Sequence, residues 1–375
     1  MPARPLTLAL LAGDGIGPEI AEATRHVLEA ADAAFGLGLA FREVEIGFPA
    51  LAAAGSTLPG PAWDEIRACD GVILGPVSHN DYPPREKGGL NPSGELRTRL
   101  DLYANIRPAR TRAGIAPRAG TPLDLVVVRE NTEGFYADRC LHSGPGEFMP
   151  TEDMVLSLRR ITRRACERIA AAAFALAERR KEAGGAGHVT AVHKANVLRM
   201  GDGLFLKCAR RAAEAHPGIA YDERIVDAMT AHLVRRPGDY DVIVTTNMFG
   251  DILSDLASEL AGGLGLAASL NAGDGAAMAQ AQHGSAPDLA GRDEANPASL
   301  IGSAAMLLDW LSERHGRPGL ARAAAAIDAA LDGALTDPAT RTADLGGTAG
   351  TRAFAEAVAR GLGAWEPRAD AGAIR

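Results

Sequence analysis

The sequence predicts an α/β fold with a largely parallel sheet, and three observations support this. Short runs of β-branched residues alternate with long segments rich in alanine, leucine and arginine, as in chains whose strands are each followed by a helix. Glycine-rich stretches such as 184-GGAG-187 and 262-GGLG-265 mark loops between these segments. The chain has 375 residues, 47% of them hydrophobic and 23% charged, which is enough for two domains, or one elaborate domain, with a full core.

The β-branched runs and the segments between them give the expected elements in chain order. Strands are predicted at residues 6–11, 72–74, 123–128, 189–193 and 241–246. Helices are predicted at residues 18–35, 152–183, 202–215, 251–260, 297–312, 321–335 and 351–362. The first apolar run ends at a Gly-Asp-Gly turn without a cleavage-site pattern, so a buried strand fits it better than a signal peptide does.

Composition excludes several classes of function. The four cysteines lie far apart without a CxxC pair, which favours reduced thiols and a cytoplasmic location. No segment approaches the roughly 18 uninterrupted apolar residues that a membrane span needs. A net charge of −8 disfavours a nucleic-acid surface, and the basic run 159-RRITRR-164 is interpreted as a solvated helix face. We therefore expect neither a membrane nor a nucleic acid as partner.

The stretch 13-GDGIGPE-19 lies between the first strand and the first helix. Its glycines allow a tight turn, and the helix N-terminus behind them favours an anion or a close backbone approach. The spacing differs from the GxGxxG dinucleotide fingerprint, so a standard Rossmann site is not expected. A plain strand-to-helix turn, with Pro18 in the first turn of the helix, fits the stretch equally well.

Three arginines lie near the ends of predicted elements. Arg97 and Arg107 fall within 91-NPSGELRTRLDLYANIRP-108, and Arg129 opens 129-RENTEGFY-136. If they converge, they would clamp carboxylates, because each guanidinium can bind one bidentately. Ordinary surface arginines are the alternative in a chain so rich in alanine and arginine.

Lysine and aspartate side chains give two further candidates. Lys194, in 193-HKANVL-198, could act as a base if burial or neighbouring cations lower its pKa, or could be a surface lysine. Asp251 and Asp255 share a helix face and repel one another unless a cation lies between them. With Asp227 they could bind Mg²⁺ or Mn²⁺ through oxygen atoms. Alternatively, Asp251 caps the helix and Asp255 pairs with an arginine.

Taken together, these motifs resemble the isocitrate/isopropylmalate dehydrogenase family, the NAD-dependent decarboxylating dehydrogenases of 3-substituted malates. The resemblance covers almost the whole chain in the family's order and also includes VDAM, NMFGDILSD, GGLGLAASLN, HGSAPDLAG, ANP and TADLGGT. HKANVL, VIVTTN and GGLGL are most similar to the homoisocitrate and NAD-isocitrate branches. The resemblance implies an isopropylmalate-dehydrogenase-like two-domain fold with a central mixed, largely parallel sheet. Residues 1–108 plus 259–375 would form a large, cofactor-binding domain, and 109–258 a small domain with the dimer interface and metal ligands.

The resemblance also implies roles for individual residues. Arg97, Arg107 and Arg129 would hold the substrate carboxylates, and Tyr136 would protonate the carbon left after CO₂ departs. Lys194, contributed by the second subunit of a homodimer, would take the proton from the C2 hydroxyl. Asp251 and Asp255 of one subunit and Asp227 of the other would bind Mg²⁺ or Mn²⁺.

For the cofactor, the resemblance implies NAD. Asp288 would accept a hydrogen bond from the ribose 2′-OH and repel a 2′-phosphate. The remaining cofactor residues would be Ile16, Asn196, His283, Gly284, Ser285, Ala286 and Asn296. The family's usual Glu-Pro-Val-His lead into this loop is replaced here by 280-QAQH-283.

Substrate choice is expected to depend on the residues before Arg97, where Asn91 and Ser93 would face the C3 substituent. Isopropylmalate enzymes carry leucines at positions 93 and 94, whereas this chain has serine and glycine. The small polar pocket favours isocitrate-like or malate- and tartrate-like hydroxy-dicarboxylates over an alkyl substituent, with 3-isopropylmalate dehydrogenase of leucine biosynthesis as the alternative. A non-catalytic regulatory subunit is a second alternative, disfavoured because Tyr136, Lys194 and the three aspartates are all retained.

Overall fold

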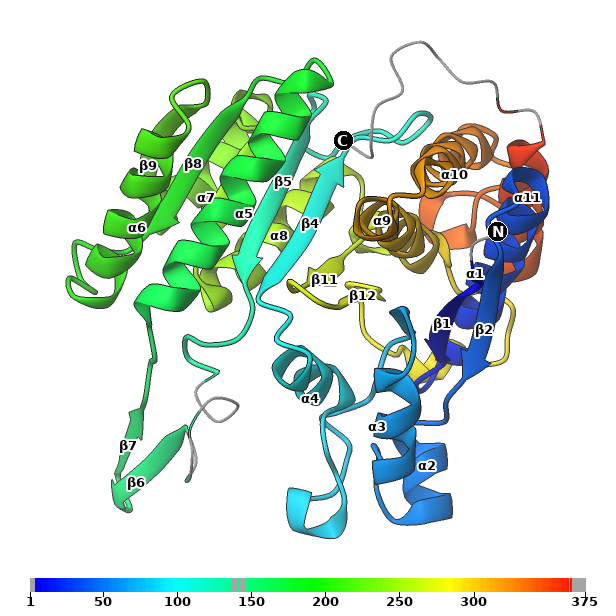
Figure 1. The fold of residues 1–375 in the computed structure, drawn as a ribbon, viewed down its shortest axis with the longest axis horizontal. Coiled ribbons are helices and arrows are strands. Elements are labelled where there is room, and N and C mark those ends of the chain that lie inside the picture. The colour runs from blue at the N-terminus through cyan, green and yellow to red at the C-terminus, as the bar shows by residue number, and fades with distance from the viewer. Residues whose placement is uncertain (1–3, 137–140, 142–143, 145, 364, 366–375) are drawn as a thin grey trace.

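One mixed sheet of ten strands runs through the molecule (Figure 1). The computed structural model describes residues 4–136, 141, 144, 146–363 and 365. The spatial order is β2 (Leu39–Glu43), β1 (Leu6–Leu11), β3 (Gly71–Leu74), β12 (Ala277–Gln280), β11 (Leu270–Ala272), β4 (Ala104–Arg110), β5 (Asp124–Glu130), β10 (Val242–Thr245), β8 (His188–His193) and β9 (Ala220–Ile225). Neighbours are parallel except at the centre, where β12, β11, β4 and β5 pair antiparallel. The predicted α/β fold with a mixed, largely parallel sheet is confirmed.

Helices cover both faces of the sheet. They are α1 (Gly17–Phe35), α2 (Gly47–Ala54), α3 (Gly60–Arg67), α4 (Pro92–Arg99), α5 (Arg163–Glu182), α6 (Gly201–Ala215), α7 (Val226–Arg235), α8 (Asn247–Ala261), α9 (Ala298–His315), α10 (Pro318–Thr336) and α11 (Thr351–Leu362). Alternate residues of a strand point to opposite faces, so Val126 and Val128 of β5 pack under α5 and α6 while Val127 packs under α7 and α8. At the other end of the sheet, α1, α9, α10 and α11 form the largest core.

The apolar cores thus lie over two halves of one sheet (Figure 1). The halves are also joined by charge, because Arg110 at the end of β4 and Arg112 just beyond it contact Asp328 and Asp332 of α10 at 2.6–3.0 Å. The division into residues 1–108 plus 259–375 and 109–258 stays a prediction. Among the described residues, no helix combines the length and apolar character that crossing a membrane requires.

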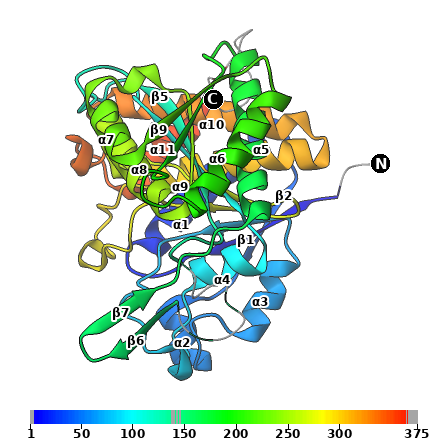
Figure 2. The same ribbon diagram turned by 90° about the vertical axis from the view of Figure 1, so that its left-hand side faces the viewer.

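The predicted helix over residues 152–183 is wrong before Arg163. Residues 152–162 instead contain β7 (Met154–Ser157). This strand pairs with β6 (Glu147–Thr151) in a hairpin that projects from the body of the molecule (Figures 1 and 2). The helix begins only where the Thr162 hydroxyl accepts a hydrogen bond from the Ala165 backbone N–H, at 3.3 Å. Besides β6 and β7, strands β2, β4, β9, β11 and β12 and helices α2, α3, α4 and α7 were not predicted.

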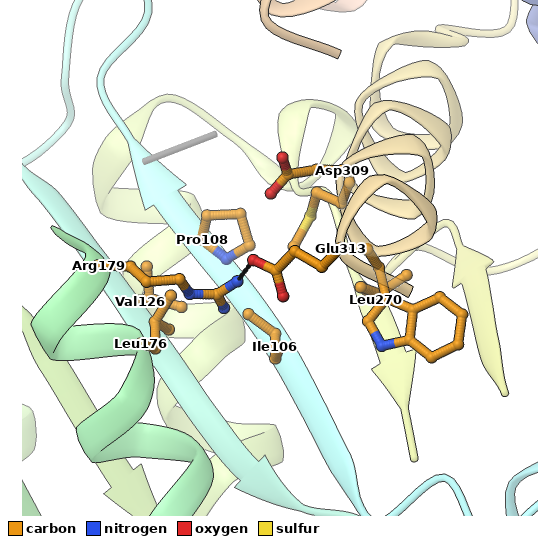
Figure 3. A pocket seen from close by; sticks show the side chains of 10 residues that line it. Ile106, Pro108, Val126, Leu176, Arg179, Leu270, Asp309 and Glu313 are labelled. Atoms are coloured by element: carbon orange, nitrogen blue, oxygen red, sulfur yellow. Dashed lines mark hydrogen bonds and ion pairs between the residues drawn. The ribbon is translucent and has the colours of Figure 1, made fainter. Parts of the chain in front are cut away.

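A small apolar cavity of about 70 Å³ lies between α5 and α9, above β4 and β11 (Figure 3). Ile106, Leu176 and Met306 line it, and Asp309 of α9 stands at its wall. Burial raises the pKa of Asp309 to about 6; the Arg179 guanidinium opposes this shift and the Glu313 carboxylate adds to it. Folding therefore extends the pH range in which Asp309 is protonated, up to about pH 6.

We predict that Asp309→Asn stabilises the protein at neutral and alkaline pH. The folded-state pKa lies above the ordinary value of 3.8, so the wild type loses stability as the pH rises through about 6, by up to about 3 kcal/mol. Urea unfolding should show the variant as the more stable protein at about pH 8, with the difference reduced to about a third near about pH 4.5. Glu356→Gln on α11, an exposed carboxylate, is the control, and an Asp309 effect that did not depend on pH would contradict the assignment.

Candidate active site

The two aspartates of α8 lie where this helix passes over β4 and β5. Asp251 and Asp255 are one helical turn apart, with side chains 36% and 52% exposed. The helix begins at Asn247, so Asp251 stands in its second turn and does not cap it. Gly250 lets α8 approach β5 closely, because a Cβ at this position would lie 2.6 Å from Cβ and Cγ of Arg129.

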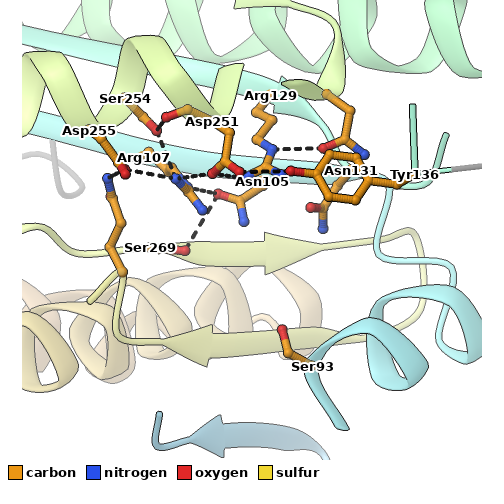
Figure 4. A network of polar contacts seen from close by, with 12 residues as sticks. Ser93, Asn105, Arg107, Arg129, Asn131, Tyr136, Asp251, Ser254, Asp255 and Ser269 are labelled. Atoms are coloured by element: carbon orange, nitrogen blue, oxygen red, sulfur yellow. Dashed lines mark hydrogen bonds and ion pairs between the residues drawn. The ribbon is translucent and has the colours of Figure 1, made fainter. Parts of the chain in front are cut away.

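Arg107 of β4 and Arg129 of β5 are buried beneath these carboxylates (Figure 4). Arg129 forms a close ion pair with Asp251, and its Nε donates to Asn247 Oδ1 at 2.9 Å. Arg107 Nη1 lies 3.1 Å from Asp251 Oδ1 and 3.4 Å from Asp255 Oδ1. Within one chain, the Arg107 guanidinium therefore supplies the positive charge between the two aspartates. The predicted contact of Asp255 with an arginine is thus present.

The arginines keep Asp251 ionised. Burial alone would raise the pKa of this carboxyl, but the charges of Arg129 and Arg107 and a hydrogen bond from Tyr136 outweigh it and hold the pKa below its ordinary value. The Tyr136 hydroxyl donates to Asp251 Oδ2 at 2.9 Å. Burial and the neighbouring charge of Arg129 lower the pKa of Arg107 to about 10, so it stays cationic at neutral pH.

The third predicted arginine belongs to the same constellation. Arg97 of α4 also helps to lower the pKa of Asp251 through its charge. Its Nη2 donates to Gln280 Oε1 at 2.8 Å, and the Ser93 hydroxyl lies 3.0–3.1 Å from both polar atoms of the Gln280 amide. Figure 4 shows Ser93 pointing from α4 toward the Arg107–Asp251 network. Asn91 caps α4, since its Oδ1 accepts from the Gly94 backbone N–H at 3.2 Å.

A row of buried amides behind the arginines was missed by the sequence analysis. Asn105 accepts from Arg107 Nε at 2.8 Å and donates to Asn271 Oδ1 at 2.7 Å. Asn131 donates to the same oxygen at 3.0 Å, and Asn271 Nδ2 lies 3.4 Å from Gln280 Oε1. These side chains link Arg107 to the residues that hold Arg97. A signal for them exists in the sequence, because Asn105 and Asn271 interrupt short apolar runs.

Lys194 and Asp227 form a second cluster within the chain. Lys194 follows β8, Asp227 lies in the first turn of α7, and Lys194 Nζ is 2.5 Å from Asp227 Oδ1. This hydrogen bond lowers the pKa of Asp227. Among the described residues of one chain, no group of three His, Cys, Asp or Glu side chains could hold a metal ion. One chain therefore does not bring Asp227 to Asp251 and Asp255.

The interpretation of 159-RRITRR-164 as a solvated helix face is wrong for Arg159. Its side chain is 10% exposed and lies between the rings of Phe135 and Phe249, 5.6 and 5.7 Å from their centroids. Its Nη2 is 2.7 Å from Oδ1 of the fully buried Asp202, whose Oδ2 accepts from the Lys194 backbone N–H at 2.5 Å. Arg159 and Asp202 thus fix the backbone at Lys194.

Two of the predicted cofactor segments, the 13-GDGIGPE-19 stretch and the loop around Ser285, contact each other. The Ile16 backbone N–H donates to Ser285 O at 2.8 Å, and the hydroxyls of Ser78 and Ser285 are 2.7 Å apart. Gly15 has φ +57°, and a Cβ there would lie 2.0 Å from Ser285 O, so only glycine allows this approach. The 13-GDGIGPE-19 stretch is therefore more than a plain turn, because it holds the loop around Ser285 by a close backbone contact.

The loop itself presents polar groups that suit a ligand. His283 Nε2 is buried and has no hydrogen-bond partner among the described residues. Burial lowers the pKa of His283, which keeps the ring neutral. Gly284 O lies 3.0 Å from His283 Nδ1, and Ala286 adopts a left-handed conformation just before the exposed Asp288.

The two remaining cofactor candidates lie in different settings. Asn296 donates to Asp344 Oδ2 and accepts from the Ala298 backbone N–H, both at 3.0 Å. Asn196 lies in the exposed turn after Lys194.

Comparison with known proteins agrees with the sequence motifs. The model of the family described as isocitrate/isopropylmalate dehydrogenase matches residues 7–358. An isocitrate/homoisocitrate dehydrogenase of Thermus thermophilus is 42% identical, covering 95% of this chain and 98% of the relative. A 3-isopropylmalate/3-methylmalate dehydrogenase of Methanocaldococcus jannaschii is 40% identical, covering 94% and 98%. The crystal structure of an isocitrate dehydrogenase from Methylococcus capsulatus matches with a TM-score of 0.83 at 39% identity, covering 95% and 99%.

We predict that Arg159→Met destabilises the protein far more than a matched change nearby. It leaves the Asp202 carboxylate buried without its ion-pair partner, which costs about 3–5 kcal/mol. Arg163→Met, on the same segment, removes only a 3.8 Å contact from a side chain that is 59% exposed, and should cost no more than about 0.5 kcal/mol. Urea unfolding measures both, and equal costs would show that the Arg159–Asp202 contact is unimportant.

Proposed function

The chain belongs to the isocitrate/isopropylmalate dehydrogenase family, and on that premise we propose that it oxidises and decarboxylates a 3-substituted malate with a small polar C3 substituent. The products are a 2-oxo acid and CO₂, the oxidant is NAD, and the metal is Mg²⁺ or Mn²⁺. The observation that carries this proposal is the convergence of Arg107, Arg129 and Tyr136 on Asp251. Cationic and proton-donating groups there surround a carboxylate that stays ionised.

The residues present fit a divalent cation. Asp251 and Asp255 provide hard oxygen atoms on one helix face, and both side chains are partly exposed. They would hold the ion together with the partner subunit's Asp227. When bound, the ion supplies Lewis-acid stabilisation of negative charge on the substrate.

The arginines and the two proton-transfer groups account for the rest of the chemistry. Arg97, Arg107 and Arg129 bind the substrate carboxylates and orient C2. The partner subunit's Lys194 accepts the proton of the C2 hydroxyl as hydride leaves C2 for the nicotinamide. Loss of CO₂ then leaves negative charge on the substrate, and the Tyr136 hydroxyl donates the proton that C3 gains.

Sharing the site between two subunits is supported by the exposed surface. Phe148, Met149, Met154, Val155 and Leu156 of the β6–β7 hairpin are all exposed, as are Leu158, Val197 and Met200. An apolar surface of this size favours burial against a protein partner. Lys194 lies just before the exposed Val197 and Met200, and its Nζ contacts Asp227 of α7. We therefore propose a homodimer.

The proposed substrate rests on the small residues just before Arg97. The proposed cofactor rests on Asp288. Ser93 and Gly94 are buried and leave room for a short substituent, and Ser93 provides a hydroxyl for it. This favours isocitrate-like or malate-like substrates, although 3-isopropylmalate is retained as the alternative. Asp288 is exposed and would accept from a ribose 2′-OH while repelling a 2′-phosphate, which favours NAD over NADP. A cytoplasmic location stays a prediction.

A substrate panel tests the reaction. We expect NADH to appear with isocitrate, homoisocitrate or malate in the presence of Mg²⁺, more slowly with 3-isopropylmalate, and not at all after EDTA treatment until metal is restored. NADP should support less turnover than NAD. Substrate binding without turnover of any compound would favour a non-catalytic regulatory subunit instead.

Mixing two inactive variants tests whether the site is shared. Lys194→Met removes the base, and Tyr136→Phe removes the proton donor while keeping its ring. Each variant alone should be nearly inactive. If each site takes Lys194 and Tyr136 from different subunits, exchange yields mixed dimers with one intact site, and the mixture regains about a quarter of wild-type activity. If both residues act within one chain, every site carries a defect and the mixture stays inactive.

A further inference from the structure

The two aspartates of α8 differ in how their carboxylates are held. Asp251 contacts Arg129 and Arg107 and accepts from Tyr136. Asp255 is half exposed, and its contact with Arg107 is long, at 3.4 Å. Its shortest contact comes from a neutral side chain, because Gln282 Nε2 donates to Asp255 Oδ1 at 2.6 Å.

Gln282 is well placed to hold this carboxylate still. It follows β12, and its backbone N–H donates to the Ser299 hydroxyl of α9 at 3.3 Å. Its Nε2 also lies 3.5 Å from the Ser258 hydroxyl on α8. The side chain thus reaches from the strand end and α9 across to α8, and its base is anchored independently of Asp255.

The orientation of the Gln282 amide is dictated by Asp255. The amide oxygen Oε1 is buried and has no hydrogen-bond partner among the described residues. Turning the amide over would bring this oxygen against the carboxylate, so the NH₂ group must face Asp255. A buried acceptor left without a partner is costly, and the contact with Asp255 outweighs that cost here.

The neutral character of this donor matters for a cation site. A lysine or arginine at position 282 would orient Asp255 equally well, but its positive charge would compete with a metal ion. An amide orients the carboxylate and leaves its full negative charge available. Hydrogen bonds of this kind to metal-binding carboxylates commonly account for about 10- to 100-fold in metal affinity.

We propose that Gln282 is a positioning residue that holds Asp255 in the orientation needed to bind the divalent cation. This rests on the proposed function, since it takes Asp255 to be a metal ligand. It assigns a role to one of the two glutamines in 280-QAQH-283, the stretch in which the chain departs from its family's pattern.

The test is a Mn²⁺ titration of the full-length protein, without substrate, followed by the electron paramagnetic resonance signal of free Mn²⁺. Gln282→Met keeps the length of the side chain and removes the donor, and we expect its Mn²⁺ affinity to fall by about 10- to 100-fold. At saturating Mn²⁺ its kcat should return close to that of the wild type, with the deficit confined to the Mn²⁺ concentration required. A purely structural role would instead lower kcat and the unfolding temperature together.

Controls separate this inference from the proposed function. Ser258→Ala removes the other neighbour of the Gln282 amide and should leave Mn²⁺ affinity unchanged. Asp255→Asn should abolish tight Mn²⁺ binding; if it binds as the wild type does, or if the wild type binds no Mn²⁺, the proposed metal site itself is wrong. If the wild type and Asp255→Asn behave as expected but Gln282→Met binds Mn²⁺ within twofold of the wild type, only the role of Gln282 is overturned. Gln282→Leu repeats the measurement should the methionine variant be unstable.

Discussion

The site depends on two buried guanidiniums that face the carboxylates of one helix. Arg107 and Arg129 stand on adjacent antiparallel strands, and α8 approaches them closely because Gly250 has no side chain. Burying such cations is costly unless carboxylates and hydrogen-bond acceptors surround them. Asp251 supplies the charge, and Asn105 and Asn247 accept hydrogen bonds from the Nε–H groups of Arg107 and Arg129. Under the proposed function, a carboxylate substrate and a divalent cation would exchange partners with these polar groups.

Much of this arrangement could be predicted from the sequence. Residues 6–11 form a short apolar run and residues 241–246 a short β-branched run, both flanked by loops, so composition alone locates these strands. The i, i+4 spacing of Asp251 and Asp255 places both on one face of a helix whatever the tertiary fold. That Arg97, Arg107 and Arg129 converge could not be derived from spacing, because they belong to α4, β4 and β5 and meet only through the topology of the sheet. For these residues the family resemblance supplied what local chemistry could not.

The failures have physical causes as well. Residues 154–157 are consecutively exposed in the hairpin, and a run of apolar residues does not reveal whether it packs inside the chain or against another protein. Strand β4 contains Pro108, which usually argues against a central strand; it is tolerated because β11 pairs only with residues 104–106. Arg159 was assigned to a solvated face because it lies in a basic run, yet it forms an ion pair with the buried Asp202, which is distant in sequence. Asn91 illustrates a further limit, since a residue type suited to substrate contact serves equally well as a helix cap.

The central strands have a mechanical consequence. The sheet passes from one half of the molecule to the other through β12, β11, β4 and β5, each hydrogen-bonded to the next. Separating the halves would break these ladders, so any change in their relative orientation must be absorbed as a gain or loss of strand twist. Such a joint resists deformation elastically and returns to its resting geometry. Rotation of one half against the other would then be limited to small angles, and the stiffness of the joint would be set by the backbone of a few short strands rather than by a loop.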